Sequence, residues 1–192
     1  MGKKKYEVIF VLDMSGSMNS LRKFTVEGYN SMLQEQKNTE KDARVTTVVF
    51  NNDRRYIHKR VPISEVEDLT FEDYVPDGCT ALYDAIGQTA AEIREKQQKE
   101  TNEGKEFETL FVITTDGREN ASKEFTGENV SGIIHWLEEN LHWEFVFMGA
   151  GLKTEAEAKK LKIRDSVITS GGIEGQKVIH HEIRRKLKDF LN

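Results

Sequence analysis

Two short apolar runs, residues 6–12 and 109–115, constrain the fold of this chain more than any other feature. Both are rich in β-branched and aromatic residues and almost free of charge. Strands of this kind are buried on both faces, which is typical of a parallel sheet covered by helices. Each run stops at a polar loop that begins with an aspartate, Asp13 in the first case and Asp116 in the second.

Apolar runs alternate with helical patterns along almost the whole chain. Strands are expected at residues 6–12, 43–50, 55–61, 109–115, 143–148 and 166–169. Helical spacing of apolar residues marks four helices, through Leu21, Phe24, Gly28 and Met32, through Leu82, Ile86, Ala90 and Ile93, through Val130, Ile133, Ile134 and Leu137, and through Ile179, Ile183, Leu187 and Leu191. Two capping-box patterns, Ser64 with Glu67 and Thr154 with Glu157, are expected to open two further short helices.

This alternation predicts a Rossmann-like, doubly wound α/β fold, with a mostly parallel sheet of about six strands and helices on both faces. A turn cluster at residues 51–53 separates two expected strands, which indicates a hairpin. One antiparallel strand, residues 55–61, is therefore expected at the edge of the sheet. Because the sequence shows no internal repeat, low-complexity tract or linker, a single domain over residues 1–192 is predicted.

The composition limits the classes of function. The formal net charge is −5 at pH 7, which argues against a general affinity for nucleic acid or for an anionic membrane. Cys79 is the only cysteine, so no intramolecular disulfide can form. No run approaches the roughly 18 apolar residues that cross a bilayer, and no small-residue cleavage site follows the first apolar run. A cytoplasmic protein is the resulting expectation.

Three oxygen-rich loops lie at the boundaries of the predicted elements. The first carries Asp13, Ser15 and Ser17 in the spacing Asp-x-Ser-x-Ser, the second places Thr80 before a helix, and the third places Asp116 after a strand. In doubly wound sheets, ligands bind beyond the carboxyl ends of the strands. Hydroxyl and carboxylate oxygens suit a hard cation such as Mg²⁺. Each residue taken singly is also an ordinary turn or helix-cap residue, so it is the combination that indicates a metal site.

These loops resemble those of the von Willebrand factor type A domain family. The metal-ion-dependent adhesion site (MIDAS) of that family has the pattern Asp-x-Ser-x-Ser, then a Thr, then an Asp, which is matched in order by Asp13, Ser15, Ser17, Thr80 and Asp116. The surrounding segments are similar as well: FVLDMSGSM at residues 10–18, GCTALYDAI at 78–86 and VITTDG at 112–117. The resemblance covers nearly the whole chain, from residue 6 through the last expected helix.

The resemblance implies a non-enzymatic module that binds another protein through a metal ion. Ser15, Ser17 and Thr80 would bind Mg²⁺ or Mn²⁺ through their hydroxyls, and Asp13 and Asp116 largely through water molecules. An Asp or Glu carboxylate of the partner protein would complete the coordination. Similar stand-alone bacterial proteins are associated with AAA+ ATPases or with tellurium-resistance components, so these are the partners that the resemblance suggests.

Residues beside the three loops are expected to form the rim of a partner-binding surface. The rim candidates are Met14, Met18, Arg118 and Asn120, with Tyr74 and Phe125 as further candidates. Arg118 could attract a partner carboxylate, although an exposed loop arginine needs no such role. Met14 and Met18 could equally be packing residues.

A different class of protein also places an aspartate at the end of its first strand, namely Mg²⁺-dependent phosphotransfer enzymes of the haloacid-dehalogenase type. Those enzymes need a second acidic residue two positions later as a general acid, and this chain has Ser15 there. No clear catalytic base stands elsewhere in the sequence. A binding module is therefore favoured over an enzyme, and no catalytic residue is assigned.

Overall fold

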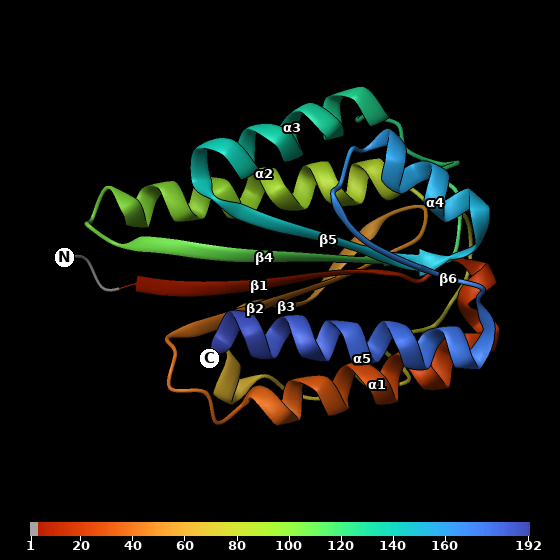
Figure 1. Cartoon of the computed structure of the whole chain (residues 1–192), viewed down its shortest axis with the longest axis horizontal. Coiled ribbons are helices and arrows are strands. Elements are labelled where there is room, and N and C mark those ends of the chain that lie inside the picture. The colour runs from red at the N-terminus through yellow and green to blue at the C-terminus, as the bar shows by residue number, and fades with distance from the viewer. Residues whose placement is uncertain (1–3) are drawn as a thin grey trace.

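A computed structural model describes residues 4–192 of the chain (Figure 1). A six-stranded sheet in the order β3-β2-β1-β4-β5-β6 forms its centre. The strands are β1 (Lys4–Asp13), β2 (Ala43–Phe50), β3 (Arg54–Pro62), β4 (Glu106–Thr115), β5 (Trp143–Ala150) and β6 (Asp165–Thr169). All neighbouring pairs are parallel except β2 with β3, which are antiparallel. The predicted fold class, including the antiparallel edge strand, is confirmed.

Helices cover both faces of the sheet (Figure 1). The helices are η1 (Gly16–Leu21), α1 (Arg22–Gln36), η2 (Ile63–Glu65), α2 (Leu82–Thr101), α3 (Gly127–Leu141), α4 (Gly151–Lys160) and α5 (Gly172–Leu191), of which η1 and η2 are short 3₁₀ helices. In Figure 1, α1 and α5 lie on one face, and α2, α3 and α4 lie on the other. Each helix in residues 4–192 is too short or too polar to span a lipid bilayer.

The strand β1 explains why this sequence forms three layers. Val8, Phe10 and Leu12 pack into the apolar cluster under α1 and α5, whereas Ile9 and Val11 pack into the cluster under α2 and α3. Alternate side chains of a strand point to opposite faces, so a run that is apolar at every position must be covered twice. The strand β1 therefore lies in the middle of the sheet. Its carboxyl end lies near the middle of the sheet edge at which the parallel strands end.

The first long helix differs from its predicted packing. Leu21 belongs to the preceding helix η1, and Phe24 and Gly28 are only half-buried. The fully buried positions of α1 are Thr25, Val26, Tyr29, Met32, Leu33 and Gln36. The 3₁₀ turn before α1 has a tighter pitch than an α-helix, so a stripe extrapolated backwards through it falls on the wrong side. Gly28 instead meets α5, because a Cβ there would lie 1.9 Å from the ring of His180.

The two predicted capping boxes are wrong. Ser64 lies inside η2 and makes no capping hydrogen bond, and η2 has Pro62 as its N-cap residue. Thr154 lies inside α4, which already begins at Gly151, and is completely buried. A Ser or Thr followed three residues later by Glu describes a helix start only where the chain is free to turn there. At α4 the turn is made earlier, at Gly151, which has a φ of +80°.

Candidate metal centre

The three oxygen-rich loops meet at the carboxyl ends of β1 and β4. These strands are neighbours, with Leu12 paired to Thr114, so Asp13 at the end of β1 and Asp116 just after β4 leave the same edge of the sheet. Thr80 reaches this edge from the loop that precedes α2. Parallel pairing of two central strands thus brings together residues that are 103 positions apart in the sequence.

Short hydrogen bonds link the predicted ligands to one another. The amide of Ser15 donates to Asp13 Oδ1 over 2.7 Å, and the hydroxyl of Ser17 donates to Asp116 Oδ1 over 2.6 Å. The hydroxyl oxygens of Ser15 and Ser17 lie 3.1 Å apart, at hydrogen-bond distance. A continuous series of hydrogen bonds therefore runs from Asp13 through Ser15 and Ser17 to Asp116 and joins the first and third loops.

Gly117 shows where the remaining oxygens point. A Cβ on this residue would lie 3.3 Å from Thr80 Oγ1, 3.8 Å from Asp13 Oδ2 and 3.9 Å from Ser17 Oγ. Oxygens from the first and second loops therefore face Gly117 of the third loop, and the lack of a side chain there leaves one small volume open between them. All five predicted ligands lie around this volume or are hydrogen-bonded to a residue that does. Their donor atoms are hydroxyl and carboxylate oxygens, which fit a hard divalent cation.

Asp13 is held in an environment that favours a positive charge nearby. Its side chain is fully buried, and this burial raises its pKa from 3.8 to about 6 although hydrogen bonds from Ser15 and Thr115 oppose the shift. Thr115 donates to Asp13 Oδ2 over 2.6 Å, and the Tyr74 hydroxyl donates to the Asp13 carbonyl oxygen. A buried carboxylate that is costly to ionise gains most from a cation beside it.

The candidate ligands differ from the His, Cys, Asp and Glu side chains that form most metal sites in proteins. Within residues 4–192, no group of three or more His, Cys, Asp or Glu side chains is arranged to hold a metal ion. Asp13 and Asp116 are the two acidic side chains among the five predicted ligands, and the other three are hydroxyl-bearing. This agrees with the Ser and Thr side chains found between the two carboxylates.

Backbone hydrogen bonds fix the three loops against each other. The Gly16 amide donates to the Gly78 carbonyl over 3.1 Å, and the Asp77 amide donates to the Met14 carbonyl over 3.0 Å. Asn120 makes two hydrogen bonds to Thr80. Its side-chain Oδ1 accepts from the Thr80 backbone N–H over 2.8 Å, and its backbone N–H donates to the Thr80 carbonyl oxygen over 3.0 Å. The hydroxyl of Thr80 is thereby positioned by a residue of the third loop.

Removal of the Asn120 side chain should weaken metal binding. Asn120→Ala leaves the Thr80 amide without its acceptor, and loss of such a supporting partner typically costs about 10–100-fold in metal affinity. We expect a loss of about tenfold in Mg²⁺ affinity by isothermal titration calorimetry. Asn120→Asp keeps an acceptor oxygen and should retain binding. Equal affinity of the alanine variant and the unchanged protein would show that Thr80 needs no such support.

The predicted rim is only partly at the surface. Arg118 and Asn120 are exposed, and Met14 is half-buried against the core. Met18 is only 3% exposed and Tyr74 is 0% exposed, so both are packing residues and not rim residues. Phe125 is half-buried, and its ring lies against Gly87 of α2. The prediction of a rim position is therefore wrong for Met18 and Tyr74.

Three residues have a part in the site that was not predicted from the sequence. Thr115 binds Asp13, Gly117 leaves the central volume open, and Asn120, expected only at the rim, positions Thr80. Thr115 and Gly117 adjoin Asp116 in the segment VITTDG. This segment was identified from the sequence, but the roles of Thr115 and Gly117 were not predicted. The role of Asn120 depends on a contact across 40 residues, for which the sequence carries no signal.

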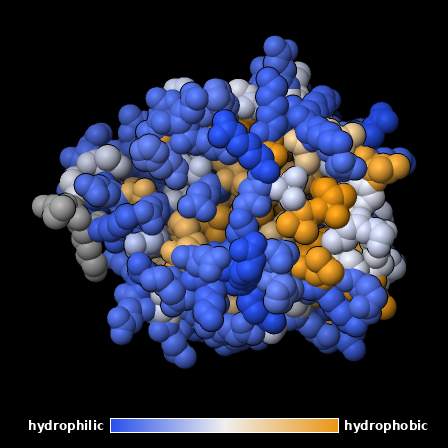
Figure 2. Space-filling model, viewed as in Figure 1, coloured by the Kyte–Doolittle hydropathy of each residue, from blue (hydrophilic) through white to orange (hydrophobic). Residues whose placement is uncertain are grey.

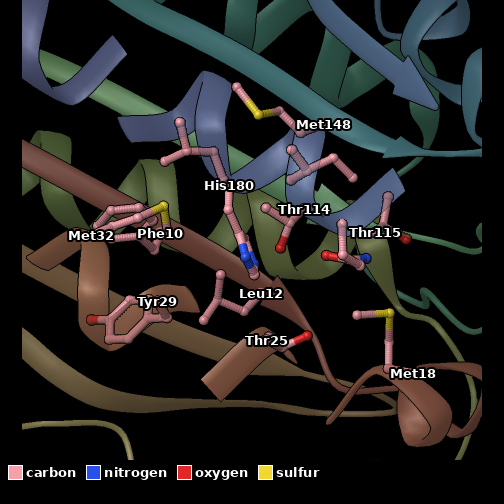
Figure 3. A pocket seen from close by; sticks show the side chains of 13 residues that line it. Phe10, Leu12, Met18, Thr25, Tyr29, Met32, Thr114, Thr115, Met148 and His180 are labelled. Carbon is pink, nitrogen blue, oxygen red and sulfur yellow. The ribbon is translucent and has the colours of Figure 1, made fainter. Parts of the chain in front are cut away.

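A cavity of about 20 Å³ lies beneath the loops, between the sheet, α1 and α5 (Figure 3). Its wall includes Thr115, and the ring of His180 points into it from α5, close to Leu12 in Figure 3. This volume is enough for about one water molecule. The cavity is too small for an organic ligand, so the open volume at Gly117 is the better candidate for a binding site on this edge.

Comparisons with known proteins agree with this architecture. No protein-family model matches the chain, and no curated protein matches it in sequence. Proximal thread matrix protein 1 from the mussel byssus is 15% identical over 95% of this chain and 46% of its own, with a TM-score of 0.67. Another structure of that mussel protein is described as having a zinc-occupied MIDAS motif.

Two further solved structures extend the likeness. The von Willebrand factor type A protein from Catenulispora acidiphila is 14% identical over 98% of this chain and 43% of its own, with a TM-score of 0.65. The manganese-loaded TRAP protein of Plasmodium vivax is 11% identical over 100% of this chain and 75% of its own, with a TM-score of 0.66. The chain thus spans less than half of the mussel and Catenulispora proteins. The chain has the fold of the von Willebrand factor type A domains.

Proposed function

We propose that this chain is a metal-ion-dependent protein-binding module. The observation that carries the proposal is the open volume beside Gly117, which is surrounded by oxygens of Asp13, Ser17 and Thr80. Ser15, Ser17 and Thr80 would hold the ion through hydroxyls, and Asp13 and Asp116 would act largely through water molecules. A carboxylate of a partner protein would complete the coordination.

The charge balance of the site supports an external ligand. Hydroxyl groups are neutral, so three of them leave most of the charge of a divalent cation uncompensated. Asp13 and Asp116 balance that charge, but each is already hydrogen-bonded to a serine of the first loop. Such partners orient the ligands of a metal without satisfying its demand for another anionic oxygen. An Asp or Glu side chain of a second protein meets this demand.

Magnesium and manganese are the ions that we propose. Both are hard cations that accept hydroxyl, carboxylate and water oxygens in octahedral geometry. Zinc in the mussel protein and manganese in the TRAP protein are properties of those proteins. Here the three atoms nearest to a Cβ on Gly117 are all oxygens, which favours the harder ions.

The proposed partner is a protein that presents an Asp or Glu in an exposed position. Arg118 is exposed two residues after Asp116 and adds a positive charge for such a carboxylate. An AAA+ ATPase or a tellurium-resistance component, in a bacterial cytoplasm, is the partner suggested by the sequence resemblance. No nucleic acid or membrane partner is proposed, because the chain carries a net charge of −5.

The phosphotransfer alternative is disfavoured by the burial of Asp13. A nucleophilic carboxylate must reach the phosphorus atom, yet Asp13 is fully buried and both of its oxygens accept hydrogen bonds. Ser15 also cannot act as the general acid that this chemistry needs. A phosphatase screen with Mg²⁺ checks the point, since turnover that is lost in Asp13→Asn would favour the enzyme.

The proposal is tested by capture of partner proteins from a lysate of the source organism. Binding should occur with Mg²⁺ and disappear with EDTA. Thr80→Ala removes a ligand hydroxyl and should abolish capture, whereas Thr80→Ser keeps a hydroxyl and should retain it. Capture that persists in EDTA or in Thr80→Ala would rule out the metal-dependent mechanism.

A further inference from the structure

The two edges of the sheet differ in how they are protected from pairing with another strand. An edge strand exposes a row of unpaired N–H and C=O groups, and proteins usually blunt it with charges, proline or bulges. The edge strand β3 has all three devices. It carries Arg54, Arg55, Lys59 and Arg60, its pairing with β2 has two register shifts, and it ends at Pro62.

The edge strand β6 has neither a proline nor a register shift with its neighbour β5, and its main protection is its short length. Its five residues, Asp165–Thr169, contain no proline and a single charge. That charge is neutralised, because Lys186 of α5 forms an ion pair with Asp165. Val167 and Ile168 are half-buried and Ser166 is exposed. Within residues 4–192, β6 forms a strand pair with β5 alone, so no strand of this part of the chain covers its other side.

Apolar side chains flank this free edge. Leu152 in the first turn of α4 is 83% exposed, Ile173 in the first turn of α5 is 46% exposed, and Val178 of α5 is 49% exposed. They are three of the six large apolar side chains that are exposed in residues 4–192. Figure 2 shows apolar side chains gathered over the half of this face where β6 and the beginnings of α4 and α5 lie. Leu152, Val167, Ile168, Ile173 and Val178 are called the β6 patch below.

We propose that the β6 patch is an interface between two copies of this chain. The β6 strands of the two copies would pair antiparallel about a two-fold axis, which joins two six-stranded sheets into one. A two-fold interface uses the same surface on both copies, so that surface must be complementary to itself. This inference does not depend on the proposed metal-binding function.

The layered arrangement makes a second copy a better occupant than an isolated peptide. The helix α4 lies on one face of the sheet and α5 on the other (Figure 1), so the apolar residues of the β6 patch lie on both sides of the free edge. An added strand alone would cover the backbone of β6 but leave Leu152 and Val178 exposed. A second copy brings its own α4 and α5, which can cover these side chains on both faces.

The charges of β6 also permit self-pairing. With Val167 on the axis, Asp165 of one copy faces Thr169 of the other, and Ser166 faces Ile168. No like charges are then directly opposite each other. This register therefore avoids the arrangement of charges that destabilises antiparallel pairs. Each Asp165 also keeps its own Lys186 as a counter-ion.

Sedimentation velocity in EDTA over micromolar to millimolar protein concentration tests the proposal. EDTA removes any association through the candidate metal centre. We expect the mass to rise towards twice that of the monomer as concentration increases. The double substitution Leu152→Lys with Val178→Lys should keep the protein monomeric over the whole range. Both side chains are exposed, so the fold should tolerate the change.

Val75→Lys is the matched control, because Val75 is 50% exposed but lies in the loop before α2. This variant should dimerise like the unchanged protein. Hydrogen exchange should also show that β6 amides become more protected as the dimer forms. A protein that stays monomeric at millimolar concentration would overturn the proposal. So would a dimer that the double variant still forms, or one whose β6 amides gain no protection.

Discussion

Gly117→Ala is expected to abolish Mg²⁺ binding while leaving the protein folded. The added methyl group would lie 3.3 Å from Thr80 Oγ1 and within 4 Å of oxygens of Asp13 and Ser17, where an ion must bind if these atoms are its ligands. Gly117 has no left-handed backbone angle, so alanine adds no backbone strain there, and the Thr80 hydroxyl needs to shift by only a few tenths of an ångström. The free energy of unfolding without metal should change by less than about 1 kcal/mol. Calorimetric titration with Mg²⁺ and urea unfolding in EDTA measure the two quantities.

Gly16→Ala is the control for this prediction. Gly16 lies in the first loop, between the two ligand serines, but a Cβ there would meet only the Gly78 backbone at ordinary contact distances of 3.5 Å and 3.9 Å. Its Mg²⁺ affinity should therefore match that of the unchanged protein. If Gly117→Ala bound Mg²⁺ as well as Gly16→Ala does, the open volume beside Gly117 could not be the metal site.

Asp13→Asn is expected to stabilise the metal-free protein at pH 7 and to eliminate its stabilisation by Mg²⁺. Burial raises the pKa of Asp13 from 3.8 to about 6, so the folded state holds this proton more tightly than the unfolded state. The penalty is absent below about pH 4, grows as pH rises, and is complete above about pH 6. A shift of this size corresponds to about 2–3 kcal/mol at pH 7.

The substitution should remove this penalty at little structural cost. The asparagine carbonyl can still accept from the Ser15 amide, and the Thr115 hydroxyl lies 3.5 Å from the Gly117 carbonyl oxygen, to which it can turn. Urea unfolding in EDTA at pH 4 and pH 7 measures the effect. The difference between the variant and the unchanged protein should appear at pH 7 and shrink at pH 4. A variant that is less stable at pH 7, or that Mg²⁺ still stabilises, would contradict the assignment.

Much of the fold could be predicted because its central strands have unambiguous patterns. The segments that became β1 and β4 are apolar at nearly every position, and only a strand covered on both faces accommodates such a run. The stripe through Leu82, Ile86 and Ile93 likewise placed α2, since all three are fully buried. The sequence pattern therefore predicted these elements correctly where their apolar side chains are fully buried.

Prediction failed where the structure depends on what a segment packs against. Phe24 had the right spacing for the buried face of α1, but the 3₁₀ turn before the helix rotates that face towards Val26 and Tyr29. Thr154 carried a capping pattern, yet the chain turns earlier, at Gly151. These choices are made by tertiary contacts, which local patterns do not contain.

The candidate site divides in the same way. Asp13, Ser15 and Ser17 could be found because close spacing after a strand is itself a signal. Thr80 and Asp116 were found at the boundaries of predicted elements, and the resemblance joined all five residues into one pattern. The arrangement around them could not, since Asn120 and Tyr74 reach the site through contacts across 40 and 61 residues. Tyr74 was expected at the surface but lies in the core, with its hydroxyl on the Asp13 carbonyl.

The central claim is that hydroxyl groups of two separate loops hold one divalent cation. Anomalous diffraction from crystals grown with Mn²⁺ tests it directly. We expect one anomalous peak beside Gly117, within bonding distance of the hydroxyls of Ser15, Ser17 and Thr80. A well-ordered crystal with no peak there, or with manganese bound only elsewhere, would contradict the claim.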